Sequence, residues 1–180
     1  LLALPLLEGD SELILTTGLE SSAYVDMTLD CQKRFGIRIG DKEKGWIIPG
    51  NQTYRAPSSF SVEGDWSNGA FWLAASALGS EVEVLGLSEE SLQADRRIRT
   101  ILDRGETDTD VREIPDLVPI LAVLACGKKE TTVLRNCGRL RLKESDRIAS
   151  VKAMIRSLGG RIRSDGNDLI IDGTGSLAGG

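Results

Sequence analysis

The amino-acid sequence predicts an α+β fold in which one structural unit is repeated, and three observations support this prediction. A strand, a polar loop, a helix, a glycine and a β-hairpin follow one another in the same order near both ends of the chain. Helix-length segments that are apolar nearly all round lie between the strands, a pattern typical of helices buried against a sheet. Twenty glycines among the 180 residues suit the tight turns between short elements.

The first copy of the unit opens with a predicted strand at residues 11–16 and a helix at residues 22–34. After Gly36, residues 37–39 and 45–50 alternate between apolar and polar side chains and are separated by Asp and Gly. This pattern is typical of a half-buried hairpin.

The last copy follows the same order. Its predicted elements are a strand, a helix and the two strands of a hairpin, at residues 130–135, 144–158, 161–163 and 168–173. Residues 71–78 and 117–126 form two further predicted helices. We expect both to be buried centrally, because their side chains are almost all apolar.

The middle copy departs from this order. It has a predicted strand at residues 81–87 and a helix at residues 92–104, on which Ile98 and Ile101 mark an apolar face. The first strands of the three copies start 70 and then 49 residues apart, a difference of 21 that equals about one hairpin with its flanks. Either a hairpin is missing near residues 105–113 or the repeat is degenerate there, and the length of the gap favours a missing hairpin.

Two features concern the organisation of the whole chain. Residues 54–60 contain Pro57 and two serines, so we expect an extended linker there. The chain begins with Leu1 rather than Met and ends at Gly180 directly after a predicted strand. We therefore expect a piece of a longer polypeptide, the alternative being a trimmed but complete domain.

Composition argues against several classes of function. A formal net charge of -5 does not suit a nucleic-acid-binding protein, although a local cluster of Arg and Lys can still bind a small anion. The absence of histidine excludes a Ser-His-Asp triad and histidine-based metal sites. The three cysteines form no Cys-x-x-Cys pair, which favours reduced thiols. Because no apolar run reaches membrane-spanning length, we expect a soluble, cytoplasmic protein.

The densest group of candidate functional residues extends from Arg139 to Arg147. A strand-like alternation places Arg139, Arg141 and Lys143 on one side, and Glu144 to Arg147 open the following helix. Cations beside a helix N-terminus make a site for phosphate or carboxylate. A solvated basic strand followed by a capped helix explains the pattern equally well.

Two acidic positions precede apolar helices. Asp116 can act as an N-cap or first-turn residue of its helix, which is the simpler interpretation, or as a general base aimed into a cleft. In residues 62–70, either Asp65 or Ser67 is expected to cap the next helix. This turn lacks the glycine spacing and the lysine of a phosphate-binding loop.

Four segments resemble motifs of the 3-phosphoshikimate 1-carboxyvinyltransferase family and occur in that family's order. Residues 61–75 resemble its domain-crossing segment, and residues 114–119 resemble its catalytic aspartate motif. Residues 141–148 resemble its second signature, and residues 21–28 are similar to its serine-tyrosine substrate motif. One such match could arise by chance, but four in order should not.

The resemblance implies the enolpyruvyl transferase fold, an inside-out α/β barrel of two domains that each contain three βαβαββ units. On this map the chain is a fragment covering part of both domains. Residues 1–56 are the last unit of the first domain, and residues 57–62 are the crossing linker. Residues 63–180 supply two units of the second domain, of which the middle one lacks its hairpin near residues 105–113.

The resemblance also implies a reaction. The family transfers the enolpyruvyl group of phosphoenolpyruvate to the 5-hydroxyl of 3-phosphoshikimate and releases phosphate, in the shikimate pathway of aromatic amino acid biosynthesis. It uses neither a metal nor an organic cofactor. The expected partners are therefore these two small molecules, with no nucleic acid and no membrane, and the parent enzyme is expected to be a monomer.

Residue roles follow from the same resemblance. Asp116 is the base near the 5-hydroxyl, and Lys143 with Glu144 helps to protonate the phosphoenolpyruvate methylene. Five residues are expected to bind substrate, with Arg147 on phosphoenolpyruvate and Ser21 on the shikimate phosphate: Ser21, Tyr24, Arg139, Lys143 and Arg147.

Several substrate-binding cations of the family have no counterpart in this chain, so we expect little or no turnover by the chain alone. Two alternatives stay open at this point. One is an enzyme like UDP-N-acetylglucosamine 1-carboxyvinyltransferase, and the other is a non-catalytic folding module that binds an anion.

Overall fold

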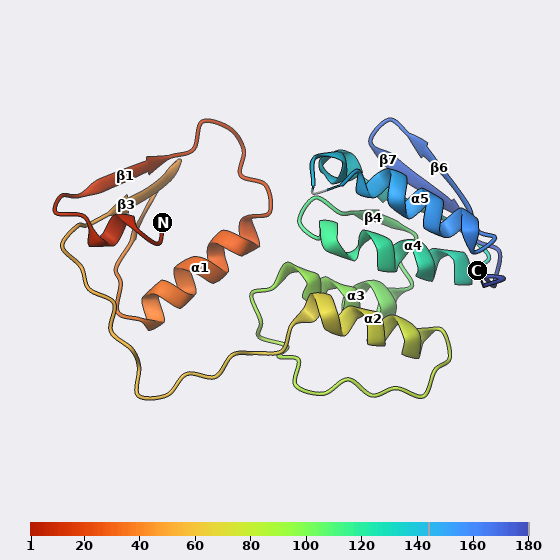
Figure 1. Ribbon diagram of the computed structural model, residues 1–180, viewed down its shortest axis with the longest axis horizontal. Coiled ribbons are helices and arrows are strands. Elements are labelled where there is room, and N and C mark those ends of the chain that lie inside the picture. The colour runs from red at the N-terminus through yellow and green to blue at the C-terminus, as the bar shows by residue number, and fades with distance from the viewer. Residues whose placement is uncertain (144, 180) are drawn as a thin grey trace. The chain divides into compact units, whose positions relative to one another are not determined.

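The computed structural model describes residues 1–143 and 145–179, which divide into two compact units (Figure 1). The first unit is Leu1–Val62, and the second begins at Glu63. Residues 52–65, around this boundary, contain neither helix nor strand. None of the helices in the described chain is long and apolar enough to cross a membrane.

The first unit is a three-stranded antiparallel sheet with one long helix. The sheet has the order β1-β3-β2. Its strands are β1 (Ser11–Ile14), β2 (Gly40–Lys42) and β3 (Gly45–Ile48), the helix is α1 (Ser22–Arg34), and a short 3-10 helix, η1 (Leu4–Leu6), precedes them. Gly45 opens β3 with φ +132, and a Cβ there would lie 1.9 Å from the carbonyl oxygen of Leu13, so only glycine fits. The prediction of a helix at residues 22–34 is confirmed.

The predicted strand at residues 37–39 is wrong by three residues, since β2 starts at Gly40. The reason lies in the side chain of Gln52. Its Oε1 accepts from the Arg38 N–H at 2.7 Å, and its Nε2 donates to the Arg38 carbonyl at 2.8 Å. The two backbone groups that a ladder would use are therefore already satisfied.

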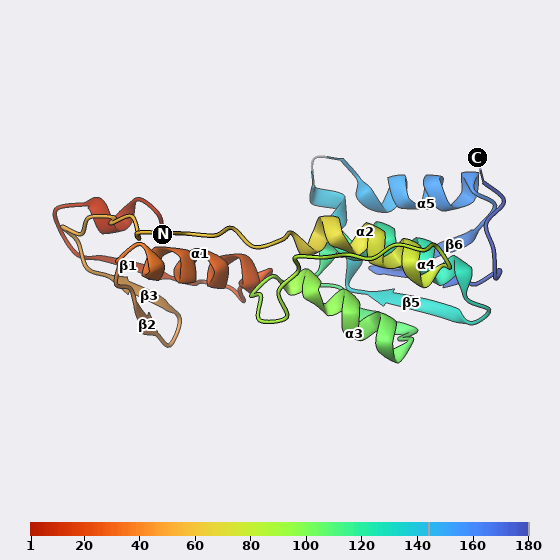
Figure 2. The same ribbon diagram turned by 90° about the horizontal axis from the view of Figure 1, so that it is seen from below.

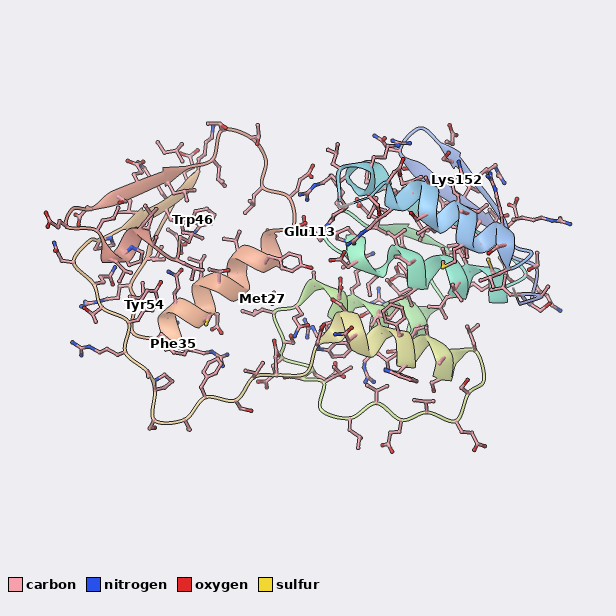
Figure 3. The ribbon with its side chains drawn as sticks, viewed as in Figure 1. Met27, Phe35, Trp46, Tyr54, Glu113 and Lys152 are labelled. Atoms are coloured by element: carbon pink, nitrogen blue, oxygen red, sulfur yellow. The ribbon has the colours of Figure 1, made fainter. Side chains whose placement is uncertain are left out.

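A second side-chain amide ties the linker to α1. The Gln32 side chain is 1% exposed and donates to the Tyr54 hydroxyl at 2.8 Å. Tyr54 in turn donates to the Leu2 carbonyl at 2.8 Å. Figure 3 shows Tyr54 and Phe35 beside the C-terminal end of α1. The extended segment that was predicted at residues 54–60 thus starts from a fixed point.

The second unit contains one complete βαβαββ sequence of elements. Its sheet has the order β4-β5-β7-β6, in which β4 and β5 are parallel and the other pairs are antiparallel. The elements of the complete unit are β4 (Asp108–Asp110), α4 (Val118–Gly127), β5 (Thr131–Arg135), α5 (Arg147–Ser157), β6 (Arg161–Asp165) and β7 (Asp168–Asp172). Figures 1 and 2 show α4 and α5 side by side, and the two helices are in contact.

Two helices and three 3-10 turns complete the second unit. They are α2 (Trp66–Ala77), η2 (Ala94–Arg96), α3 (Arg97–Arg104), η3 (Pro115–Leu117) and η4 (Cys137–Leu142). The predicted helix at residues 92–104 is therefore a 3-10 turn followed by a shorter α-helix, with Ile98 and Ile101 buried as expected. The helix predicted at residues 144–158 starts at Arg147, because Asp146 is its N-cap and accepts from the Ala149 N–H at 3.0 Å.

The two helices predicted to be buried centrally differ. Helix α4 is buried on nearly every side, as predicted. In α2, however, Phe71 and Trp72 are 59% and 60% exposed. Helix α2 buries a stripe at four-residue spacing, formed by Trp66, Ala70 and Ala74, and the two large aromatic rings lie outside this stripe. Apolar composition alone therefore gave the wrong burial for α2.

The predicted strand at residues 81–87 is wrong, since these residues form no strand. In the first copy β1 pairs with β3, and in the last copy β5 pairs with β7. Each first strand thus pairs with the second strand of the hairpin in its own copy. In the described chain no hairpin lies between Gly105 and β4, so the segment at 81–87 lacks the partner that the first strands of the other two copies use.

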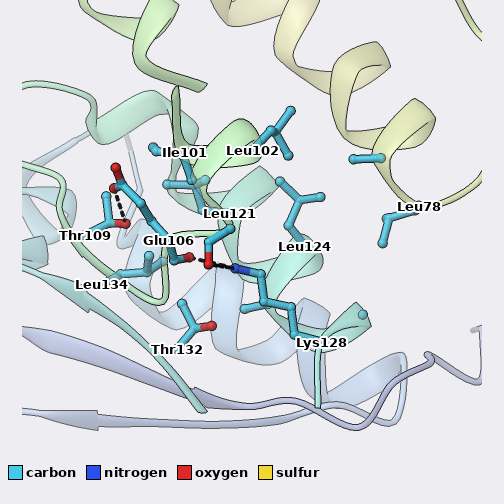
Figure 4. A pocket seen from close by; sticks show the side chains of 14 residues that line it. Leu78, Ile101, Leu102, Glu106, Thr109, Leu121, Leu124, Lys128, Thr132 and Leu134 are labelled. Carbon is cyan, nitrogen blue, oxygen red and sulfur yellow. Dashed lines mark hydrogen bonds between the residues drawn. The ribbon is translucent and has the colours of Figure 1, made fainter. Parts of the chain in front are cut away.

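The chain instead passes directly from α3 to the short strand β4. A cavity of about 210 Å³ opens beside this connection, among α3, α4, β5 and the end of α2 (Figure 4). Lys128 donates from its Nζ to the carbonyl oxygens of Gly105 and Glu106, at 3.1 and 2.6 Å (Figure 4). These two carbonyls lie just beyond α3, so the ammonium group also stands at the negative, C-terminal end of the helix dipole.

The strand-like alternation predicted from Arg139 to Lys143 is also wrong, because residues 137–142 form the 3-10 helix η4. Asn136 has φ +63 and turns the chain out of β5, and the Cys137 N–H then donates to the Asn167 carbonyl at 2.7 Å. Cys137 and Leu140, three residues apart, are both 1% exposed. This is the spacing of one face of a 3-10 helix, so burial favours the turn over the strand.

Candidate functional site

The site is built around Asp116 in η3. Its neighbours Ile114 and Leu117 are 1% and 0% exposed, and Pro115 fixes the backbone between them. The N-cap position of α4 is Leu117 and that of η3 is Ile114, so Asp116 occupies neither. Asp116 is therefore not the N-cap of either helix, but it does lie in the first turn of η3.

Two cations from the second predicted motif meet this carboxylate. Arg147, the first residue of α5, donates from Nη1 to Asp116 Oδ1. Lys143 places its Nζ 3.9 Å from the same oxygen. The side chains of Asp116, Lys143 and Arg147 are 29%, 30% and 32% exposed, so a ligand can reach all three. We call these three residues the Asp116 cluster.

A buried carboxylate that the sequence analysis missed lies near this cluster. Asp95 in η2 is 5% exposed and accepts from the Ser67 hydroxyl at 2.5 Å. Burial is the largest cause that raises the pKa of Asp95, and the hydrogen bond from Ser67 opposes it. The charges of Asp116 and Asp65 raise this pKa further, whereas Lys143 lowers it.

A signal for Asp95 was present in the sequence. Asp95 precedes Ile98 by three residues and Leu102 by seven, so it lies on the apolar face of the predicted helix. An acidic residue on a buried face is unusual unless it has a partner. That pattern could have marked Asp95 as a candidate.

The N-terminus of α2 is fastened to the segment that carries Asp95. Asp65 is the N-cap and accepts from the Ser67 N–H at 2.8 Å, which confirms one of the two predicted caps. The Gln93 side chain accepts from the Trp66 N–H at 2.8 Å and donates to Glu63 at 3.1 Å. These bonds fix the position of Ser67 relative to Asp95.

The other predicted residues lie elsewhere or outside the description. Arg141 donates to Asn167 Oδ1 at 3.0 Å and to the Gly166 carbonyl at 3.1 Å, so it supports the β6–β7 turn. Arg139 is exposed on η4. Glu144 lies outside the described residues.

Ser21 and Tyr24 belong to the first unit, at the start of α1. Ser21 is the N-cap and has φ +55, and the Tyr24 N–H donates to the Ser21 carbonyl at 3.2 Å. Tyr24 is 45% exposed.

The cysteines are free, as predicted: Cys31 is exposed, and Cys126 and Cys137 are buried. Burial raises the pKa of the Cys137 thiol to about 12, so at neutral pH this thiol is protonated and unreactive.

Solved structures identify the fold class. An EPSP synthase from Acinetobacter baumannii matches with a TM-score of 0.76 at 20% identity, over 98% of this chain and 45% of that one. The enolpyruvyl transferase NikO from Streptomyces tendae matches with a TM-score of 0.58 at 17% identity, over 94% of this chain and 44% of that one. The chain therefore has the enolpyruvyl transferase fold, as the resemblance implied.

Sequence comparison identifies the family. The family model for EPSP synthase (3-phosphoshikimate 1-carboxyvinyltransferase) matches residues 1–108 and 104–180. The 3-phosphoshikimate 1-carboxyvinyltransferases of Clostridioides difficile (strain 630) and Clostridium kluyveri are 40% and 42% identical to this chain and match all of it. The chain belongs to the EPSP synthase family. It spans about half the length of these relatives, 46% and 47%.

The comparisons bear on the gap in the middle copy. The match to the Clostridioides difficile relative extends over 200 positions for the 180 residues of this chain, a difference of 20. The two stretches matched by the family model meet at residues 104–108, where the chain passes from α3 to β4. A hairpin missing at this place stays a prediction.

Proposed function

We propose that this chain supplies part of the active site of a 3-phosphoshikimate 1-carboxyvinyltransferase. The reaction transfers the enolpyruvyl group of phosphoenolpyruvate to the 5-hydroxyl of 3-phosphoshikimate and releases phosphate. The observation that carries the proposal is the meeting of two separate motifs, since Asp116 pairs with Arg147 and lies 3.9 Å from Lys143.

The cluster suits this chemistry. An arginine guanidinium and a lysine ammonium bind the carboxylate or phosphate of phosphoenolpyruvate through charge-assisted hydrogen bonds. A carboxylate beside them can accept the proton that the attacking hydroxyl loses. Asp116 accepts a hydrogen bond from Arg147, and an incoming anion would compete for the same guanidinium.

The remaining roles are part of the same proposal. Ser21 and Tyr24 would contact 3-phosphoshikimate, Glu144 would act with Lys143 in proton transfer, and Arg139 would bind substrate. Residues 1–56 would form the last unit of the first domain, and residues 57–62 would cross to the second domain. Residues 63–180 would supply two units of that second domain. The whole enzyme would act as a cytoplasmic monomer without a cofactor. The curated relatives favour this reaction over that of a UDP-N-acetylglucosamine transferase.

The test is phosphate release from phosphoenolpyruvate in the presence of 3-phosphoshikimate. We expect no turnover by the chain alone, and turnover when it is mixed with the complementary part of the Clostridioides difficile relative. In that mixture Asp116→Ala and Lys143→Met should each lower the rate at least about 100-fold.

Lys152→Met is the matched control for Lys143→Met. Lys152 is a half-buried lysine on α5 whose Nζ donates to Ser164 Oγ at 3.0 Å, and Figure 3 shows its place on the helix. This substitution should leave the rate unchanged. If Asp116→Ala keeps the full rate in an active mixture, the assignment of the site is wrong. If the mixture stays inactive and the chain binds phosphoenolpyruvate no better than Lys143→Met does, the proposed function fails.

A further inference from the structure

Asp95 is a buried carboxylate to which the proposed chemistry gives no role. It is 5% exposed, and Ser67 donates its hydroxyl hydrogen to Asp95 Oδ2 at 2.5 Å. Gln93, two residues earlier, accepts from the Trp66 N–H at 2.8 Å and donates to the Gly64 carbonyl at 2.9 Å. The carboxylate is therefore held in one position by bonds from the start of α2.

The arginines that follow on the same segment are engaged elsewhere. Arg96 donates to the carbonyl oxygen of Glu89, and Arg99 pairs with the Glu89 carboxylate at 2.9 Å. Arg97 pairs with Glu106 at 3.5 Å. Local ion pairing thus does not explain why an acid is buried at this place.

The charges that act on Asp95 come from other segments. They belong to Asp116 and Lys143 of the cluster and to Asp65 at the cap of α2. Lys143 Nζ lies 3.9 Å from Asp116 Oδ1, which is longer than a hydrogen bond. The ammonium group therefore acts on both carboxylates through its charge, on Asp116 in this ion pair and on Asp95 from a neighbouring segment.

We infer that Asp95 is a positioning residue of the Asp116 cluster: its fixed carboxylate adds a second negative charge to Asp116, Lys143 and Arg147 and so sets how strongly they bind an anion. This inference rests on the proposed function, in which the cluster binds phosphoenolpyruvate. With both carboxylates charged, the two acids balance the two cations. Without the charge on Asp95, the same group of residues is net positive.

The test measures sulfate and phosphoenolpyruvate binding to the whole chain by calorimetry. Sulfate keeps its charge between pH 5 and 8, so any pH dependence comes from the protein. Asp95→Asn keeps the size of the side chain and an oxygen that accepts from Ser67, but removes the charge. We expect sulfate to bind this variant about fivefold more tightly at pH 7.

Two controls separate charge from structure. Asp65→Asn removes a charge at the exposed cap of α2 while keeping a good N-cap residue, so sulfate affinity should change less than about 1.5-fold.

The second control is the pH profile. In the unsubstituted chain, sulfate affinity should rise as pH falls through the raised pKa of Asp95, because protonation removes the repulsion between the Asp95 carboxylate and the anion. Asp95→Asn should show a smaller rise, because only the part caused by protonation of Asp95 is removed. Ser67→Ala removes a hydrogen bond that lowers the pKa of Asp95, so the sulfate affinity of this variant should begin to rise at a higher pH.

Urea denaturation first shows whether Asp95→Asn is folded. The inference is overturned if the folded variant binds sulfate with the affinity and pH profile of the unsubstituted chain. If sulfate behaves as expected but phosphoenolpyruvate does not bind, the inference stands and the proposed function fails. If neither anion binds, the inference is decided by the titration of the Asp95 carboxyl group, monitored by carbon-13 NMR. Lys143→Met must then raise the Asp95 pKa and Lys152→Met must not. The same Asp95 pKa in both variants would reject the inference.

Discussion

The last and the middle copies of the repeat differ in one element, and that element decides whether a strand forms. In the last copy β5 pairs with β7, the second strand of the hairpin that follows α5. In the middle copy residues 81–87 have a similar alternation of apolar and polar residues, but in the part of the chain that the structure describes no hairpin lies between α3 and β4. The comparison teaches that strand propensity is realised only where a ladder partner satisfies the backbone.

The largest expected effect is on the free energy of unfolding, which a substitution in the last copy should lower much more than one in the middle copy. Ile171 in β7 is fully buried, whereas Leu85 in the unpaired segment is 78% exposed. Ile171→Ala should lower the free energy of unfolding by about 3 kcal/mol, because it leaves a cavity in the core. Leu85→Ala should change it by less than about 0.5 kcal/mol. Urea denaturation of both variants measures this contrast, and similar losses would show that residues 81–87 are packed as a strand.

A gain-of-structure experiment sharpens the comparison. A second copy of residues 159–173, inserted between Gly105 and Glu106, would supply a hairpin after α3. The amides of Val82 and Val84 should then exchange with solvent at least about 10-fold more slowly, because they gain ladder hydrogen bonds. An insert of equal length made of Gly and Ser is the control. Equal exchange rates with both inserts would mean that the missing hairpin is not the cause.

The direct connection from α3 to β4 should depend on Lys128. Lys128→Met removes hydrogen bonds to the carbonyls of Gly105 and Glu106 and should cost about 1 kcal/mol of unfolding free energy. Lys129→Met, at the neighbouring exposed position, should cost less than about 0.3 kcal/mol. Thermal and urea unfolding check both values. An equal effect of the two substitutions would show that Lys128 does not secure this connection.

The smallest expected effect concerns the short strand β4. Asp108 pairs with Arg135 of β5, and hydrogen bonding to this guanidinium lowers the pKa of Asp108. The pair therefore stabilises the fold above the unfolded pKa of Asp108, and this contribution is lost as pH falls through the lowered folded value. Asp108→Asn should shift the urea midpoint slightly at pH 7 and not at pH 2. A shift of the same size at both pH values would exclude the ion pair as its cause.

The sequence predicted the elements that carry a clear periodicity of apolar residues or clear turn residues. The helix at 22–34, the strand at 130–135 and the hairpin at 161–173 are all found, because their periodicity and turn residues agree with the structure. Strand β4 was missed because its three residues, Asp108 to Asp110, are all polar. They form a strand only because they pair with the neighbouring β5. The local sequence carries no periodicity that predicts such a pairing.

The candidate site was predictable in part. Motif recognition found Asp116, Lys143 and Arg147, which the structure brings together. It could not show that Arg141 turns toward the β6–β7 turn, because that depends on η4 replacing a strand. Asp95 was missed because its position on the apolar face of a helix was not weighed against its charge.

The two-residue turn between β6 and β7 has a consequence for the order of folding. Gly166, with φ +56, and Asn167 join strands that pair from Asp165 and Asp168 outward. A hairpin of this kind closes within about 10 microseconds. Strand β5 can then add to β7, although Thr131 and its partner Asp172 are 41 residues apart. We expect this sheet to form the nucleus, while residues 81–87 join after the rate-limiting barrier and leave the folding rate unchanged when substituted.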